Sequence, residues 1–170
     1  MTRLATALEQ GIEKLALALA ILAALAMTAI VGLIVASVIL RKFASPLHIT
    51  EEMVGLLLSV SLFLALPMVT LKAGHVRVSI VETLLAGRAR ALLAKAALVV
   101  GTLFFAWLAI EAVPWWEFAY RLNLKTETAR ILLYPWMALL PISVGLTGLI
   151  FFLRLVGLID NAEAAPDLES

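Results

Sequence analysis

The chain contains no cysteine, which excludes disulfides, thiolate metal sites and cysteine nucleophiles. Charged side chains are also scarce: they make up 15% of the residues, against about 25% in an ordinary soluble domain. The net charge is only +1, and no basic cluster is interleaved with aromatic residues. Nucleic acid is therefore excluded as an expected partner.

Long apolar stretches take the place of the missing charges. Apolar residues make up 64% of the chain, and the mean hydropathy is +1.07. Residues 15–40 carry no charged side chain and exceed the roughly 20 residues that a helix needs to cross a bilayer. This stretch also exceeds the core of a secretory signal, about 7–15 residues, so we expect a retained span. We predict an all-α integral membrane protein with spans at about 15–40, 52–72, 92–114 and 131–153.

The third span is the least clear, because its uncharged part, residues 96–110, is too short to cross alone. It must include Lys95, Glu111 or both near its ends, where a long side chain can reach the headgroups. Trp115 and Trp116 lie just beyond Glu111, as is typical of the membrane interface.

Short amphipathic segments accompany the membrane domain, which we place at residues 15–155. In the arm at residues 1–14, Leu4, Leu8 and Ile12 recur at helical spacing, which predicts an interfacial helix on the membrane surface. A similar stripe at residues 78–85 predicts a second one. The tail at 156–170 combines acidic and small residues and is expected to be flexible.

The basic residues indicate an orientation. Four spans place both termini on one side of the membrane, and eight Lys and Arg residues then lie on that side, against five on the other. The positive-inside rule therefore favours cytoplasmic termini.

Prolines interrupt two of the spans and predict helix kinks at Pro67, Pro135 and Pro141. Kinks of this kind can break a helix around a transported substrate, or they can be tolerated where the helix packs against a neighbour. We favour the second interpretation, because no charged or amide side chain lies near these prolines in the sequence.

The sequence offers no catalytic, metal or cofactor site. His48 and His75 are the only histidines, and the expected topology puts them on opposite faces of the membrane, so they cannot both bind one haem iron. No Ser/His/Asp set, carboxylate pair at one depth or phosphate-binding glycine loop is present. The lack of charge in the middle of the four spans also argues against a transporter that works alone.

Glu51 and Glu52 stand at the start of the second span and allow two interpretations. They follow Thr50, a plausible N-cap, so they can simply stabilise the first helical turn. Alternatively, Glu52 can form an ion pair with Arg41 across the short loop.

A series of residues recurs in a fixed order along the spans and their ends, namely Arg41, Phe43, Glu52, Gly74, His75, Val78, Pro135 and Pro141. This order, over about residues 15–155, resembles that of a known family, the small membrane (DctQ) subunit of tripartite ATP-independent periplasmic (TRAP) transporters. Lys42 replaces a usual aromatic residue, and Ser79 stands where the family commonly has Asp.

The resemblance implies a division of labour in the bacterial inner membrane. A periplasmic protein captures a carboxylate-bearing solute, and a large elevator-type subunit carries it inward with sodium. The small subunit, among membrane lipids, is a scaffold for the large one and a docking surface for the binding protein. It holds no cofactor, and sodium is expected in the large subunit. The implied interface residues are Arg41, Phe43, Glu51, Glu52, Gly74, His75 and Arg77, and the implied docking loop contains Arg121, Lys125 and Arg130.

Two alternatives from other classes remain open. A self-sufficient four-helix multidrug exporter needs a buried carboxylate in the first span, which residues 15–40 lack. A membrane anchor for a redox enzyme needs haem-binding histidines on facing helices, which the expected positions of His48 and His75 disfavour.

Overall fold

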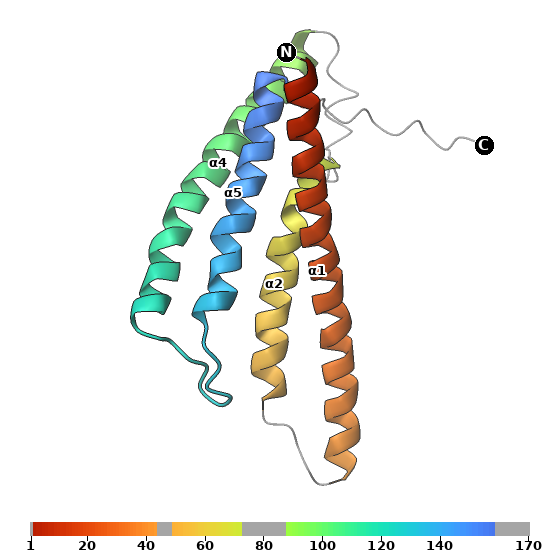
Figure 1. Cartoon of the computed structure of the whole chain (residues 1–170), viewed down its shortest axis with the longest axis vertical. Helices are drawn as coiled ribbons and strands as arrows, with labels where there is room; N and C mark the ends of the chain where they lie inside the picture. The colour runs from red at the N-terminus through yellow and green to blue at the C-terminus, as the bar shows by residue number, and fades with distance from the viewer. Residues whose placement is uncertain (1, 44–48, 73–87, 159–170) are drawn as a thin grey trace, which may run out of the picture.

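The computed structural model describes residues 2–43, 49–72 and 88–158. These residues form four helices (Figure 1), which are α1 (Thr2–Lys42), α2 (Thr50–Leu71), α4 (Arg88–Arg121) and α5 (Tyr134–Val156). Each helix contains a segment long and apolar enough to cross a membrane. The chain is therefore an all-α, multi-pass membrane protein, as its composition predicts.

The four helices lie side by side in the order α4, α5, α2, α1 (Figure 1). The start of α1, the end of α2, the start of α4 and the end of α5 lie at one end of the bundle, which we call the terminal end. The α4–α5 loop lies at the other end, which we call the loop end. Helix α4 packs mainly against α5 and is therefore the most exposed of the four helices. In its spanning segment 6% of the residues are buried, against 44% in that of α5.

Two helices, α1 and α4, extend well beyond their expected bounds. The expected arm at 1–14 is not a separate helix, because α1 continues from Thr2 through the first span to Lys42. Ile12 explains this continuity, since it packs with Ile150 and Leu153 and so ties the arm to the bundle. Helix α4 continues through Pro114 to Arg121, although we expected the span to end at about residue 114. The second expected interfacial helix and residues 159–170 of the tail lie outside the described residues.

The packed centre of the bundle lies between α2 and α5. Pro67 is buried inside α2, and because proline has no backbone N–H, it cannot bond the carbonyl of Phe63 four residues earlier. The hydroxyl of Ser143 on α5 donates a hydrogen bond to this carbonyl instead. Ser143 is fully buried, so the contact satisfies a polar group that would otherwise be stranded in an apolar interior. The proline thus fits the packing interpretation rather than a substrate site.

The other two prolines behave differently from each other. Pro141 lies inside α5, as expected for a kink position. Pro135 lies in the first turn of α5, so the predicted kink there is wrong. An amide in the first turn has no partner within its own helix, and proline at this position therefore helps to begin the helix.

Glycines allow α4 and α5 to approach closely. A Cβ atom added at Gly148 would lie 3.3 Å from Cβ of Phe105, and one at Gly101 would lie 2.8 Å from the ring of Phe151. The rings of Phe105 and Phe151 are stacked, with centroids 5.4 Å apart. Small residues and stacked rings therefore form the contact between these two helices.

Candidate functional site

The chain between α4 and α5 folds into an ordered hairpin loop, residues 122–133, at the loop end. Lys125 and Leu132 pair as an antiparallel bridge. The N–H of Thr126 donates to the carbonyl of Ile131 at 2.9 Å, and Ile131 N–H donates back to Oγ1 of Thr126 at 3.1 Å. Arg130 adopts a left-handed backbone conformation, with φ of 52°. The loop thus has a defined shape of its own.

Glu52 fastens the hairpin loop to the first turn of α2. Its Oε1 accepts a hydrogen bond from the N–H of Thr128 at 2.6 Å, and its Oε2 accepts one from the N–H of Ala129 at 2.8 Å. Hydrogen bonds to a charged acceptor are among the stronger ones in proteins. The first turn of a helix also favours a negative charge. One carboxylate therefore joins the start of α2 to the segment that leads into α5.

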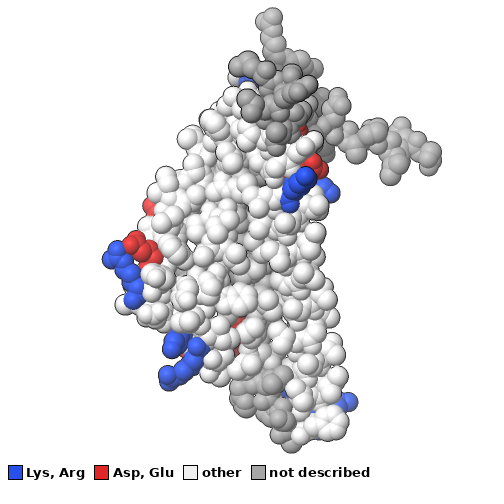
Figure 2. All heavy atoms as spheres, viewed as in Figure 1, with Lys and Arg blue, Asp and Glu red and all other residues white. Residues whose placement is uncertain are grey.

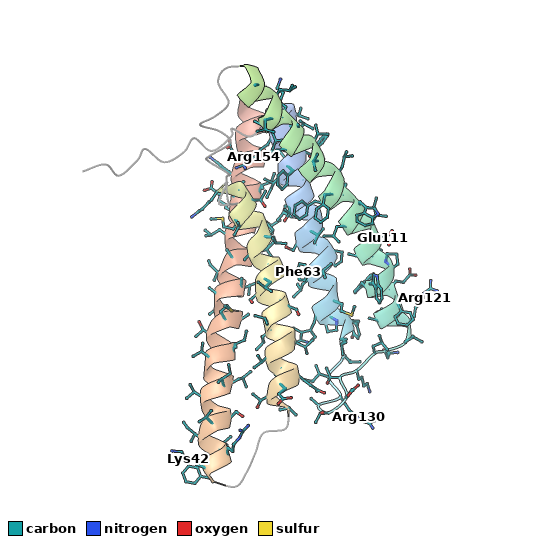
Figure 3. The ribbon with its side chains drawn as sticks, turned by 180° about the vertical axis from the view of Figure 1, so that it is seen from behind. Lys42, Phe63, Glu111, Arg121, Arg130 and Arg154 are labelled. Carbon is teal, nitrogen blue, oxygen red and sulfur yellow. The ribbon has the colours of Figure 1, made fainter. Side chains whose placement is uncertain are left out.

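The expected pair between Arg41 and Glu52 is not formed. Helix α1 continues past the start of α2, so its last residues lie further out along the bundle than Glu52 (Figures 1 and 3). Arg41 and Phe43 are exposed at this end of α1. Glu51 is exposed beside the half-buried Glu52. The two acidic neighbours therefore have different roles in the structure, because Glu52 accepts hydrogen bonds from the loop amides and Glu51 does not.

The three basic residues of the expected docking loop all lie at the loop end, where Figure 3 labels Arg121 and Arg130. Arg121 is paired with Glu117 one helical turn earlier, with Nη2 2.5 Å from Oε1. Lys125 and Arg130 are exposed, and neither forms an ion pair within the described part of the chain. These two cations are available to an acidic partner. Gly74, His75 and Arg77 lie outside the described residues.

Arg154, one of the eight basic residues expected on the side of the termini, has a structural role that the sequence did not predict. It lies in the last turn of α5 and is 8% exposed. Its Nη1 donates to the carbonyl of Thr70 at 2.8 Å, and its Nη2 donates to the carbonyl of Leu71. The end of a helix leaves carbonyls without helical partners and carries partial negative charge. Arg154 therefore caps α2 from α5 (Figure 3).

Several polar side chains inside the bundle form hydrogen bonds to its own backbone. Ser61, Ser143 and Thr147 donate to backbone carbonyls, as Arg154 does. Among the described residues, no group of three His, Asp or Glu side chains could hold a metal ion. In Figure 2 the charged side chains lie around the margins of the molecule and leave most of this face uncharged.

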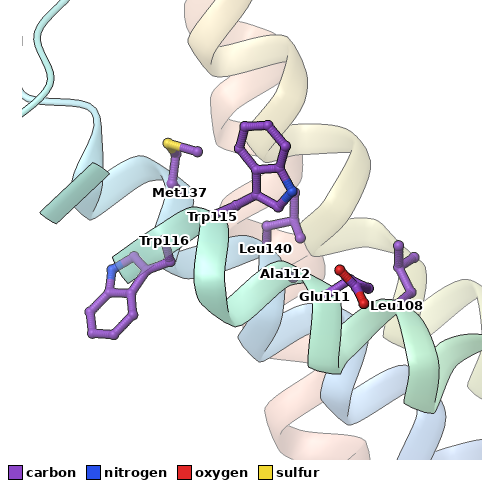
Figure 4. A pocket seen from close by; sticks show the side chains of 7 residues that line it. All are labelled: Leu108, Glu111, Ala112, Trp115, Trp116, Met137 and Leu140. Atoms are coloured by element: carbon purple, nitrogen blue, oxygen red, sulfur yellow. The ribbon is translucent and has the colours of Figure 1, made fainter. Parts of the chain in front are cut away.

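A groove of about 320 Å³ lies between α4 and α5 (Figure 4). Its lining is apolar except for one carboxylate, and it consists of Leu108, Glu111, Ala112, Trp115, Trp116, Met137 and Leu140. In the sequence, only Glu111 shortly before the pair Trp115 and Trp116 pointed to this groove, and the contribution of α5 could not be predicted.

Replacing Glu52 with glutamine should loosen the hairpin loop, because an uncharged amide offers one oxygen where the carboxylate offers two. Loss of a charge-assisted hydrogen bond should speed exchange of the Thr128 and Ala129 amides about tenfold. Hydrogen–deuterium exchange of the purified protein measures this change. Glu51→Gln is the matched control and should leave the loop unchanged. Equal exchange in both variants would show that Glu52 does not fasten the loop.

The family model described as "Tripartite ATP-independent periplasmic transporters, DctQ component" matches residues 30–161. This range includes α2, α4, α5, the hairpin loop and Glu52. No curated protein and no solved structure matches the chain.

Proposed function

Because the chain belongs to the DctQ component family of tripartite ATP-independent periplasmic transporters, we propose that it is the scaffold subunit of a sodium-driven, binding-protein-dependent carrier of carboxylate-bearing solutes. Members of this family are components of transporters, and the family is not an enzyme family. In this proposal the large membrane subunit binds sodium and solute, and the present chain enlarges the fixed wall against which that subunit moves. The bundle lies in the bacterial inner membrane with both termini cytoplasmic.

One observation carries the scaffold role: the interior of the described bundle offers a solute nothing to bind. Its buried hydroxyls and Arg154 donate to backbone carbonyls, as described above. Residues 15–40, 53–71 and 135–153 of α1, α2 and α5 carry no charge at all, and Glu111 of α4 lies on the outer side of its helix, away from this interior (Figure 3). A pathway for a charged solute and its ion normally contains an ionisable residue within the membrane. The row of helices instead provides a broad apolar surface for a second membrane protein.

The hairpin loop supports a role in docking the binding protein. The proposed orientation puts the loop end on the periplasmic side, where such a protein is found. The loop presents Lys125 and Arg130 without partners among the described residues, and Glu52 holds it in place. A fixed loop loses less conformational freedom when a partner binds than a mobile one does. Acidic side chains of the binding protein are the complementary partner.

Reconstitution tests the proposal directly. Liposomes that contain the large subunit and this chain, supplied with the binding protein and an inward sodium gradient, should take up the solute. Liposomes with this chain alone should show no uptake above that of empty liposomes. The large subunit alone should show much reduced uptake, because its fixed wall is incomplete. Sodium-driven uptake by the purified small chain would contradict the scaffold role.

A further inference from the structure

The outer surface of α4 faces away from the rest of the bundle. Leu103, Trp107 and Ile110 are 66%, 61% and 68% exposed. Exposed apolar side chains on a membrane helix suit lipid chains and a partner helix equally well. The apolar surface alone therefore does not identify what covers α4.

Glu111 makes this surface unusual. It lies on the outer side of α4 (Figure 3) and lines the groove between α4 and α5 (Figure 4). The spanning segment of α4 continues to Arg121 instead of ending at about residue 114, so Glu111 does not lie near the end of the span as expected. It precedes Arg121 by ten residues, which places it about 15 Å from the end of the helix. Its neighbours across the groove, Met137 and Leu140, lie in the first two turns of α5, inside the segment of α5 that can span the membrane. No ion pair with Glu111 is formed within the described residues.

The next carboxylate on the same helix provides a contrast. Glu117 lies closer to the end of α4 and is paired with Arg121 of its own chain. A carboxylate on a spanning helix is costly in lipid, and such residues typically face a protein partner or a polar cavity. Glu111 therefore needs a cation that Glu117 already has.

This chain does not supply that cation. Between Lys95 and Arg121, α4 contains no basic residue, and residues 15–40, 53–71 and 135–153 of the other helices contain none either. Lys95 precedes Glu111 by 16 residues, or about 24 Å along the helix. A second copy inserted in the same orientation would bring the same uncharged segments to this depth. The partner must therefore be a different chain.

We propose that the groove receives a transmembrane helix of the large membrane subunit, with a lysine or arginine of that helix placed against Glu111. Leu108, Trp115, Met137 and Leu140 form the apolar walls for its side chains. This inference rests on the proposed function, because it takes the large subunit as the partner. Beyond the proposed function, it identifies the groove between α4 and α5 as the binding surface and requires a positive charge on the partner helix.

Charge changes at Glu111 test the proposal in the assembled complex. The large subunit is co-expressed with an affinity tag, and the amount of this chain that co-purifies is measured. Glu111→Gln should lower recovery severalfold, and Glu111→Lys should lower it at least about tenfold, because a second cation would then face the first across the interface. Glu117→Gln is the matched control on the same helix and should leave recovery unchanged. Gel filtration of each variant alone checks that the bundle is intact, as is expected for an exposed residue.

Photo-crosslinking then identifies the occupant. A benzoylphenylalanine at position 108 in the groove should crosslink to one spanning segment of the large subunit that contains a lysine or arginine. The same group at Val31, exposed on α1, serves as a comparison site. Normal recovery of Glu111→Lys, or crosslinks from position 108 to lipid alone in an intact complex, would overturn the proposal. If the unmodified chain does not co-purify with the large subunit at all, the proposed function itself fails, and the two results are distinguishable.

Discussion

Replacing Arg154 with leucine should destabilise the protein by about 2–5 kcal/mol, since the change removes the donors of one buried and one half-buried carbonyl. Arg154 bonds the carbonyls of Thr70 and Leu71 at the end of α2. Leucine fills part of the space but has no hydrogen-bond donor for these two oxygens. It also removes the positive charge that complements the end of the helix. We expect α2 to separate from α5 first at the terminal end.

Two further variants make the Arg154 prediction specific. Arg154→Lys should recover only part of the lost stability, because an ammonium cannot reproduce the planar fork that reaches two oxygens. Arg121→Leu removes an arginine whose side chain is 73% exposed and paired at the surface, so it should cost only about 0–1 kcal/mol. Unfolding in detergent, followed by the fluorescence of the four tryptophans, measures all three. Similar losses at positions 154 and 121 would contradict a capping role for Arg154.

The sequence was a good guide to the membrane fold, because the patterns that define it are local. Each span is a contiguous apolar segment, so hydropathy alone indicates four helices. Their ends were harder to predict, because they depend on contacts with other helices. The arm before the first span looked like a surface helix, but Ile12 packs against α5 and α1 continues without a break. Pro135 looked like a kink because the start of α5 was expected three residues too early.

The candidate site shows the same limit. Glu52 was recognised as a landmark, but its partners were not, because Thr128 is 76 residues away and its contribution is a backbone amide. A backbone donor leaves no signature in residue types, whereas Arg41 offered an obvious but wrong charge partner. Ser143 was missed for a related reason: its acceptor is the carbonyl that Pro67 leaves free, on another helix. A proline in the sequence shows that one backbone N–H is missing from a helix, but the sequence does not show which side chain donates to the free carbonyl instead.

The close contact between α4 and α5 leads to the second large effect. Gly101→Leu should destabilise the bundle by about 3 kcal/mol, because added side-chain volume in a filled contact forces helices apart. Even the Cβ atom would lie 2.8 Å from the Phe151 ring, which is held in place by its stacking on Phe105. Gly55→Leu is the matched control, since a Cβ at that exposed position in α2 meets nothing within 4 Å.

The same substitution should also reduce binding of the large subunit, because the groove is built from both helices. Leu108 and Trp115 come from α4, whereas Met137 and Leu140 come from α5. A change in the crossing of these helices at Gly101 alters the groove without touching any residue that lines it. Thermal unfolding of the isolated chain and recovery on the tagged large subunit measure the two effects separately. Gly101→Leu should lower both and Gly55→Leu neither; full stability in Gly101→Leu would show that α4 can move away from α5 at no cost.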